Sequence, residues 1–152
     1  MFKVENLLRK QEYAAAIQLL EQMTTRDPGN EEAMLRLGKA YEQIRQPDKA
    51  VAILEQAAKL NPNSAKLQAE LGYAYEYNQQ VDKAIATLEE AVKMDSGNAQ
   101  AMLYLGGAYM EAGQRDKAIA AFEKAIQLDP EDTRARAALS SLRGDVEPDA
   151  GK

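Results

Sequence analysis

A repeated segment of 34 residues constrains the fold of this chain more than any other feature. Three segments, which begin at Met34, Gln68 and Met102, place a leucine, a glycine and a tyrosine at the same later positions. An alanine and then a large apolar residue follow each segment at a fixed distance: Ala50 and Leu54, Ala84 and Leu88, Ala118 and Phe122. A fixed period of this size predicts a stacked array of units, each packed mainly against its neighbours.

Within one period, the residue spacing predicts two antiparallel helices. Asn30 is a favourable N-cap residue, and Leu37 and Tyr41 then follow at helical spacing on one apolar face. Pro47 interrupts this pattern, and a second apolar helix face follows it. Pro62 ends the unit, because proline disfavours helical conformation at the residue before it.

Glycine recurs in the middle of the first predicted helix of each unit, as Gly38, Gly72 and Gly106. Glycine in a helix interior costs roughly 1 kcal/mol relative to alanine, so its recurrence needs a structural reason. We expect the missing Cβ to let the second helix of the same unit approach closely, and the recurring alanines of that second helix to serve the same contact.

This pattern resembles the tetratricopeptide repeat family, whose signature is a 34-residue helix–turn–helix unit. The resemblance covers residues 31–132. Two columns depart from the family: its tryptophan position holds Met34, Gln68 and Met102, and its proline position holds Ser96 once. The resemblance implies an all-α fold, a right-handed α-solenoid of helix–turn–helix repeats.

We expect one domain over residues 1–144. Its predicted parts are a partial repeat at 1–30, full repeats at 31–64, 65–98 and 99–132, and a capping helix at 133–143. Residues 145–152 contain three acidic residues, a proline and a glycine, and are expected to form a disordered acidic tail.

The composition argues against catalysis and against several classes of ligand. The chain contains no cysteine and no histidine, so the usual general base and the usual ligands of zinc are missing. Its formal net charge is −5 with mixed signs, whereas nucleic-acid binding requires a basic stripe. We therefore expect a protein that is not an enzyme and that has no metal site, no cofactor and no nucleic-acid partner.

No stretch of the sequence reads as a signal peptide or as a membrane-spanning segment. The expected location is cytoplasmic, unless the chain is a fragment of an exported protein.

The resemblance implies that the first helix of each repeat lines a concave groove that binds peptides. Successive helical residues turn by about 100°, so positions opposite the core-facing leucines point into this groove. The predicted peptide-binding residues are Leu35, Lys39, Lys66, Tyr73, Tyr77, Leu103, Tyr104 and Met110. The expected ligand is a short segment of a protein partner with apolar anchors.

The same geometry brings further side chains to the predicted groove. These are Glu32, Glu42, Gln43, Ala69, Glu76, Gln100, Gly107 and Glu111, with Arg36 at the edge and Arg134 of the capping helix completing it. Such mixed charge suits the orientation of a peptide more than strong attraction.

Some family members hold chaperone C-termini in a clamp of lysine, asparagine and arginine side chains. The matching positions here are Leu35, Lys39, Glu70, Gln100 and Tyr104, which do not fit that pattern. We therefore do not expect binding of that kind.

A structural role is the alternative to peptide binding. The partial first repeat is expected to leave Phe2, Val4, Leu7 and Leu8 as apolar surface. Through this end the chain could form a homo-oligomer, either as a self-associating scaffold or as a dimeric secretion-type chaperone.

Overall fold

The computed structural model describes residues 1–144, and within this range all regular structure is helical. The helices are α1 (Phe2–Arg9), α2 (Tyr13–Arg26), α3 (Glu31–Gln43), α4 (Pro47–Leu60), α5 (Ala65–Tyr77), α6 (Val81–Met94), α7 (Ala99–Glu111), α8 (Arg115–Leu128) and α9 (Thr133–Arg143). The prediction of an all-α repeat solenoid is confirmed. The predicted tail at 145–152 lies outside the described residues.

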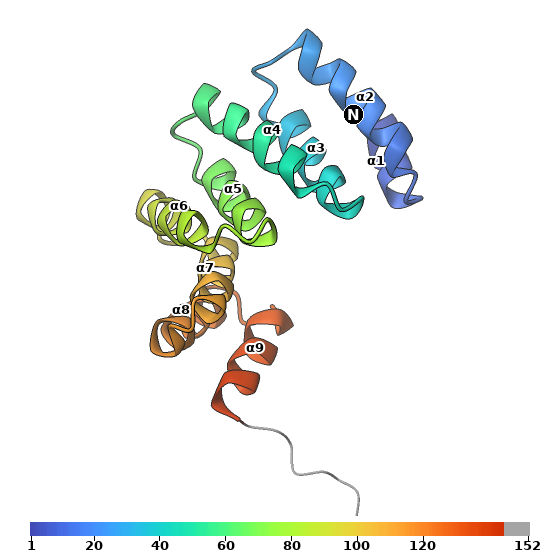
Figure 1. Ribbon diagram of the computed structural model, residues 1–152. Helices are drawn as coiled ribbons and strands as arrows, with labels where there is room; N and C mark the ends of the chain where they lie inside the picture. The colour runs from blue at the N-terminus through green and yellow to red at the C-terminus, as the bar shows by residue number, and fades with distance from the viewer. Residues whose placement is uncertain (145–152) are drawn as a thin grey trace, which may run out of the picture.

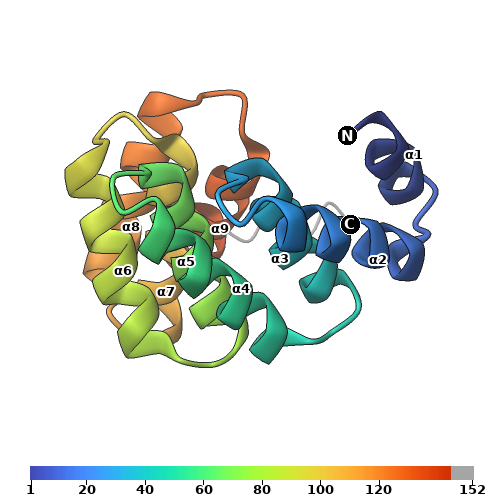
Figure 2. The same cartoon turned by 90° about the horizontal axis from the view of Figure 1, so that it is seen from above.

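The helices stack in chain order as an arc with α1 and α9 at its two ends (Figure 1). The helices α3, α5 and α7 form the inner side, and α4, α6 and α8 form the outer side (Figures 1 and 2). Neighbouring inner helices contact one another directly, α3 with α5 and α5 with α7. A membrane-spanning segment is not found among α1 to α9, because each of these helices is too short or too polar for that role.

Polar side chains fix the N-terminal ends of the inner helices. The Asn30 and Asn98 side-chain oxygens accept hydrogen bonds from the backbone N–H groups of Ala33 and Ala101, at 2.9 and 3.0 Å. Ser64 accepts one in the same way at the start of α5. These bonds satisfy backbone donors that have no partner within the helix, so each inner helix begins at a defined residue.

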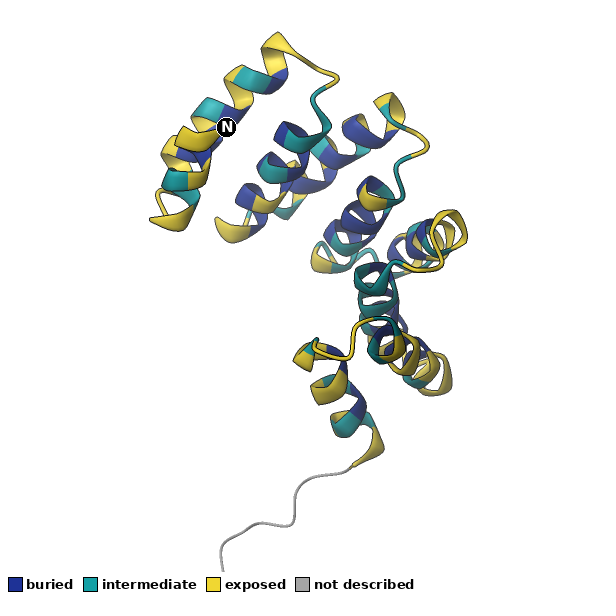
Figure 3. Ribbon diagram, turned by 180° about the vertical axis from the view of Figure 1, so that it is seen from behind, coloured by how far each residue is buried: buried dark blue, intermediate teal, exposed yellow. Residues whose placement is uncertain are grey.

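The core is an elongated strip rather than a single central cluster (Figure 3). One cluster of buried residues runs from α3 to α9, a second joins α1 and α2 to α3 and α4, and Ile53 packs against both. The glycine column lies in this strip. A Cβ added at Gly72 would lie 2.4 Å from Leu88 Cγ, and one at Gly106 would lie 2.6 Å from Phe122 Cε1. These distances are too short for any real Cβ. The predicted close approach of the two helices of a repeat is therefore confirmed.

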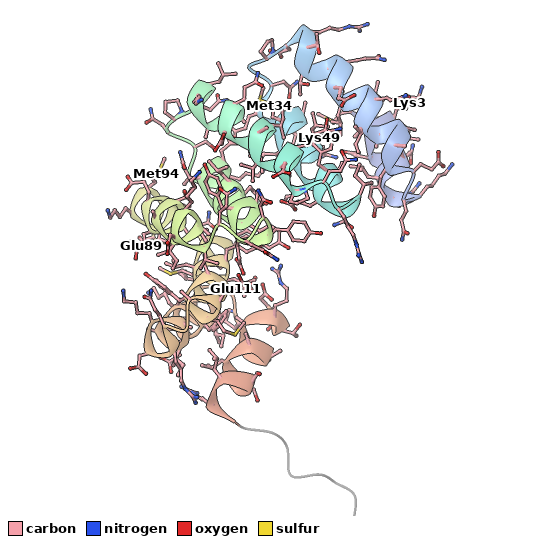
Figure 4. All side chains as sticks on the ribbon, viewed as in Figure 1. Lys3, Met34, Lys49, Glu89, Met94 and Glu111 are labelled. Atoms are coloured by element: carbon pink, nitrogen blue, oxygen red, sulfur yellow. The ribbon has the colours of Figure 1, made fainter. Side chains whose placement is uncertain are left out.

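A second repeating contact joins each outer helix to the next inner helix. The tyrosine hydroxyl of the inner helix donates a hydrogen bond to a glutamate of the preceding outer helix. The pairs are Tyr41 with Glu21, Tyr75 with Glu55 and Tyr109 with Glu89, at 2.5, 2.6 and 2.5 Å, and the Arg143–Glu123 ion pair continues the series. Burial, together with the bonded carboxylate, raises the pKa of each of these tyrosines to about 12. Figure 4 marks Glu89 on α6, which is one of the outer helices.

The N-terminal unit departs from the sequence expectation at one residue. Val4 was expected to lie on an exposed apolar surface, but it is fully buried in a cluster with Leu20 and Leu37. The reason is that α1 still spans 8 residues, which is long enough to pack its apolar side on α2. Phe2, the first residue of α1, remains 78% exposed.

Candidate functional site

An open cavity of about 500 Å³ lies where the inner helices and α9 converge. Its lining side chains come from α3, α5, α7 and α9: Lys39, Glu42, Gln43, Glu70, Tyr73, Glu76, Gln100, Leu103, Tyr104, Gly107 and Arg134. Because most of these residues sit on rigid helices, the cavity is formed before any ligand arrives.

Three tyrosines from two neighbouring helices form a stack beside this cavity. The ring of Tyr73 on α5 stacks on that of Tyr104 on α7, with 4.5 Å between the ring centroids, and on that of Tyr77 at 6.5 Å. The hydroxyl of Tyr77 donates a hydrogen bond to the backbone carbonyl of Glu42 at 3.3 Å. Burial raises the pKa of both Tyr73 and Tyr104, and nearby carboxylates raise it further. The stack therefore lies in a negative electrostatic environment.

Two of the lining glutamates expose little of their surface to solvent. Glu42 is 8% exposed and Glu70 is 6% exposed. Glu70 is paired with the ammonium group of Lys39, at 2.7 Å. The Glu42 carboxylate takes part in no hydrogen bond or ion pair with any residue that the structure describes. Burial raises the pKa of Glu42 to about 7; the charge of Glu70 adds to this increase, and Lys39 opposes it.

The third carboxylate lies between α5 and α7. A Cβ added at Gly107 would lie 2.9 Å from Glu76 Oε1, so the missing side chain on α7 leaves room for this carboxylate. Burial, and then the charge of Glu111 at the end of α7 (Figure 4), raise the pKa of Glu76 to about 7. Among residues 1–144, Glu76 also has no hydrogen-bonding or ion-pair partner for its carboxylate.

Both cationic side chains of the cavity are already engaged. Lys39 is held by Glu70, as described above. Arg134 on α9 pairs with Asp132 at 2.6 Å and donates a hydrogen bond to Gln100 at 3.2 Å. The cavity thus contains two carboxylates that lack a partner, Glu42 and Glu76. Within the described chain, the cavity lining has no unpaired cation that could form an ion pair with them.

The structure brings some of the predicted peptide-binding residues together and leaves others apart. Lys39, Tyr73, Leu103 and Tyr104 line the cavity, and Tyr77 extends the tyrosine stack. Two others are exposed but do not line the cavity. These are Lys66, which pairs with Glu32 at 3.3 Å, and Met110.

The expectation that Leu35 points into the groove is wrong. Leu35 is 3% exposed and belongs to the core cluster. In α3 and α5 this position, held by Leu35 and Ala69, is covered where the next inner helix packs, whereas Leu103 at the same position of α7, the last inner helix, lines the cavity. A helical wheel for one helix does not include this contact, because it comes from the stacking of repeats.

Glu70 is a cavity residue that the groove prediction missed. It lies 34 positions after Arg36, which was placed at the groove edge, and 34 before Tyr104, which was predicted to bind the peptide. Applying the same offset to the middle repeat would have found it.

The comparisons with known proteins agree with the fold. Two family profiles described as tetratricopeptide repeat match residues 7–72 and 69–133. No curated protein sequence matches at a significant level.

Several solved structures are similar over most of the chain. A crystal structure of MamA has 30% identity and a TM-score of 0.78, and covers 93% of this chain and 83% of the other. A MamA fragment from Desulfovibrio magneticus RS-1 has 26% identity and a TM-score of 0.77, over 93% and 81% of the two chains. The structure of YrrB, described as a tetratricopeptide protein with an unusual peptide-binding site, has 24% identity and a TM-score of 0.76, over 89% and 70%.

Proposed function

The chain belongs to the tetratricopeptide repeat family, and from this premise we propose that it is a non-catalytic scaffold that binds a peptide segment of a partner protein in its concave cavity. Proteins of this family mediate protein–protein interactions. The proposal goes further in assigning the interaction to the inner face and to the cavity between α3, α5, α7 and α9.

The observation that carries this proposal is the Tyr73–Tyr104 stack beside an open cavity. Large aromatic side chains that are already fixed in place give contact area without the loss of side-chain entropy on binding. Such residues are also the commonest energetic centres of protein interfaces. Leu103 adds apolar surface, and polar groups around it can orient a peptide backbone.

The test is the double substitution Tyr73→Ala/Tyr104→Ala. A library of random linear peptides displayed on phage is selected against the unaltered chain, and the affinity of the enriched peptides is measured by fluorescence anisotropy. We expect the double variant to bind them at least about tenfold more weakly, because truncation of an anchor at an interface centre costs about 2 kcal/mol or more.

The matched control is Leu60→Ala/Met94→Ala, which removes two exposed apolar side chains from the ends of outer helices α4 and α6. This variant should bind like the unaltered chain. Circular dichroism establishes that all three proteins are folded. If the tyrosine variant and the unaltered chain bind the peptides with equal affinity, the cavity is not the binding site.

Self-association through the N-terminal end is the second candidate function. It is favoured by the exposure of Phe2 and Met1 on α1 and next to it. If this end is the interface, static light scattering should give a mass that rises with concentration, and Phe2→Ser should return it to that of the monomer. A mass that stays monomeric for the unaltered chain at all concentrations would reject this alternative.

A further inference from the structure

We propose that the cavity receives one basic side chain of the bound segment, between the tyrosine stack and the carboxylates of Glu42 and Glu76, and that it prefers arginine to lysine. This inference rests on the proposed function, and it specifies the chemistry of the partner. It is carried by the charges of the cavity, by the burial of Glu42 and by the tyrosine stack.

The first step is the balance of charge inside the cavity. Its lining contains three carboxylates, Glu42, Glu70 and Glu76, and two cations. One cation is bound to Glu70, and the other, Arg134, is held by Asp132 outside this group. When ionised, Glu42 and Glu76 therefore present two negative charges to a ligand. An arginine or lysine side chain complements them, whereas an acidic segment is repelled.

The second step is the state of Glu42. A carboxylate on a mostly buried side chain is normally hydrogen-bonded, because partial desolvation without a partner is costly. Glu42 as a residue is 8% exposed, and its carboxylate has no partner in the described chain; its oxygens keep contact with solvent only through the cavity that they line. A cation that enters the cavity supplies the missing bond. Such bonds between charged groups are roughly twice as strong as neutral ones.

The third step concerns the choice of cation. Tyr73 and Tyr104 lie beside the carboxylates, and both Glu42 and Glu70 act electrostatically on the two phenol groups. A guanidinium group stacks on aromatic rings and donates hydrogen bonds in a planar fork to carboxylates. An ammonium group is a compact charge that loses more hydration in such a place. The combination of rings and carboxylates therefore favours arginine.

The chain's own C-terminal segment is a poor occupant by the same criterion. Its sequence contains Asp145, Glu147 and Asp149 against a single Lys152. A partner segment with an arginine satisfies the cavity better than this acidic sequence does.

The experiment starts from the peptides selected by phage display against the full chain. The best cavity-binding peptide is synthesised with its basic residue as arginine, as lysine and as citrulline, which keeps the shape of arginine without the charge. Each peptide is titrated against the unaltered chain, against Glu42→Gln/Glu76→Gln and against Glu90→Gln/Glu131→Gln. The last variant removes the same charge from exposed positions outside the cavity.

We expect the arginine peptide to bind the unaltered chain and the control variant equally. Citrulline should weaken binding to both by about tenfold or more, and lysine should weaken it less. Against Glu42→Gln/Glu76→Gln, arginine and citrulline should bind with nearly the same weak affinity, because the charges that distinguish them are gone.

A second readout is the release of protons on binding. Near neutral pH, Glu42 is surrounded by Lys39, Glu70, Tyr73 and Tyr104, and Glu76 faces Glu111, so both are partly protonated before the cation arrives. Calorimetry in buffers of different ionisation enthalpy should show proton release by the unaltered chain and little by Glu42→Gln/Glu76→Gln.

The possible failures are distinguishable. If selected peptides bind in a way that depends on Tyr73 and Tyr104 but contain no basic residue, the inference is wrong and the proposed function stands. The same holds if citrulline costs equal affinity in the unaltered chain and the glutamine variant. If no peptide binds, or binding ignores the tyrosines, then the proposed function fails and the inference fails with it.

Discussion

Truncation of Leu88 to alanine is expected to lower the free energy of unfolding by about 2–5 kcal/mol, because it leaves a cavity in the middle of the core strip. Leu88 is completely buried and contacts Gly72 of the same repeat. The measurement is chemical denaturation followed by circular dichroism. It is best analysed with nearest-neighbour terms, because neighbouring repeats supply much of each other's stability.

Substitution of Gly72, which packs against Leu88, is the second half of this prediction. A Cβ at position 72 would lie 2.4 Å from Leu88 Cγ, so Gly72→Ala should destabilise the chain by about 1–3 kcal/mol through overpacking. This loss should appear although alanine is the better helix former by roughly 1 kcal/mol. In Gly72→Ala/Leu88→Ala the new methyl group enters the space that the leucine leaves. The double variant should therefore lose less stability than the sum of the two single losses.

Gly107→Ala is the matched control for Gly72→Ala. It too lies in an inner helix, but its added Cβ would meet only the flexible carboxylate end of Glu76. Here the gain in helix propensity should prevail and stabilise the chain by about 0.5–1 kcal/mol. Additive losses in the double variant, or equal effects at positions 72 and 107, would contradict the close-packing explanation of the glycine column.

The glycine column also marks how far the sequence could predict the structure. Gly38, Gly72 and Gly106 recur because of contacts within one repeat, and such contacts can be deduced from a period and a helical wheel. The burial of Leu35 depends instead on how one inner helix packs against the next. A helical wheel does not contain that information, and the prediction failed at that residue.

The candidate site could be predicted from the sequence to the same extent as the fold. The wheel placed Tyr73 and Glu42 on the inner face, and it could indicate Glu70 by its repeat offset. The stacking of Tyr73 on Tyr104 could not be predicted, because the rings come from different repeats and their distance depends on the stacking angle. The pairing of Lys39 with Glu70, which leaves Glu42 without a partner, depends on the same angle.

Replacement of Glu42 by glutamine is expected to stabilise the chain at alkaline pH and to change little at acidic pH. Burial raises the folded-state pKa of Glu42 from 4.5 to about 7, and the charge of Glu70 contributes, with Lys39 acting in the opposite direction. The folded state thus holds the proton more tightly than the unfolded chain does. The stability linked to this proton is fully present below about pH 4.5 and is lost as the pH rises through about 7.

The measurable quantity is the difference in free energy of unfolding between Glu42→Gln and the unaltered chain. Taking the difference matters, because other carboxyl groups have the opposite effect on stability; Arg36 lowers the pKa of Glu32, for example. The difference should be near zero below about pH 4.5 and grow to the order of 1–3 kcal/mol at about pH 8. Glu90→Gln, which alters an exposed carboxylate, should show no comparable growth. A difference that does not change with pH would mean that Glu42 is already paired or solvated in the folded chain. The cavity would then not have the unmet negative charge that distinguishes a site for a basic side chain.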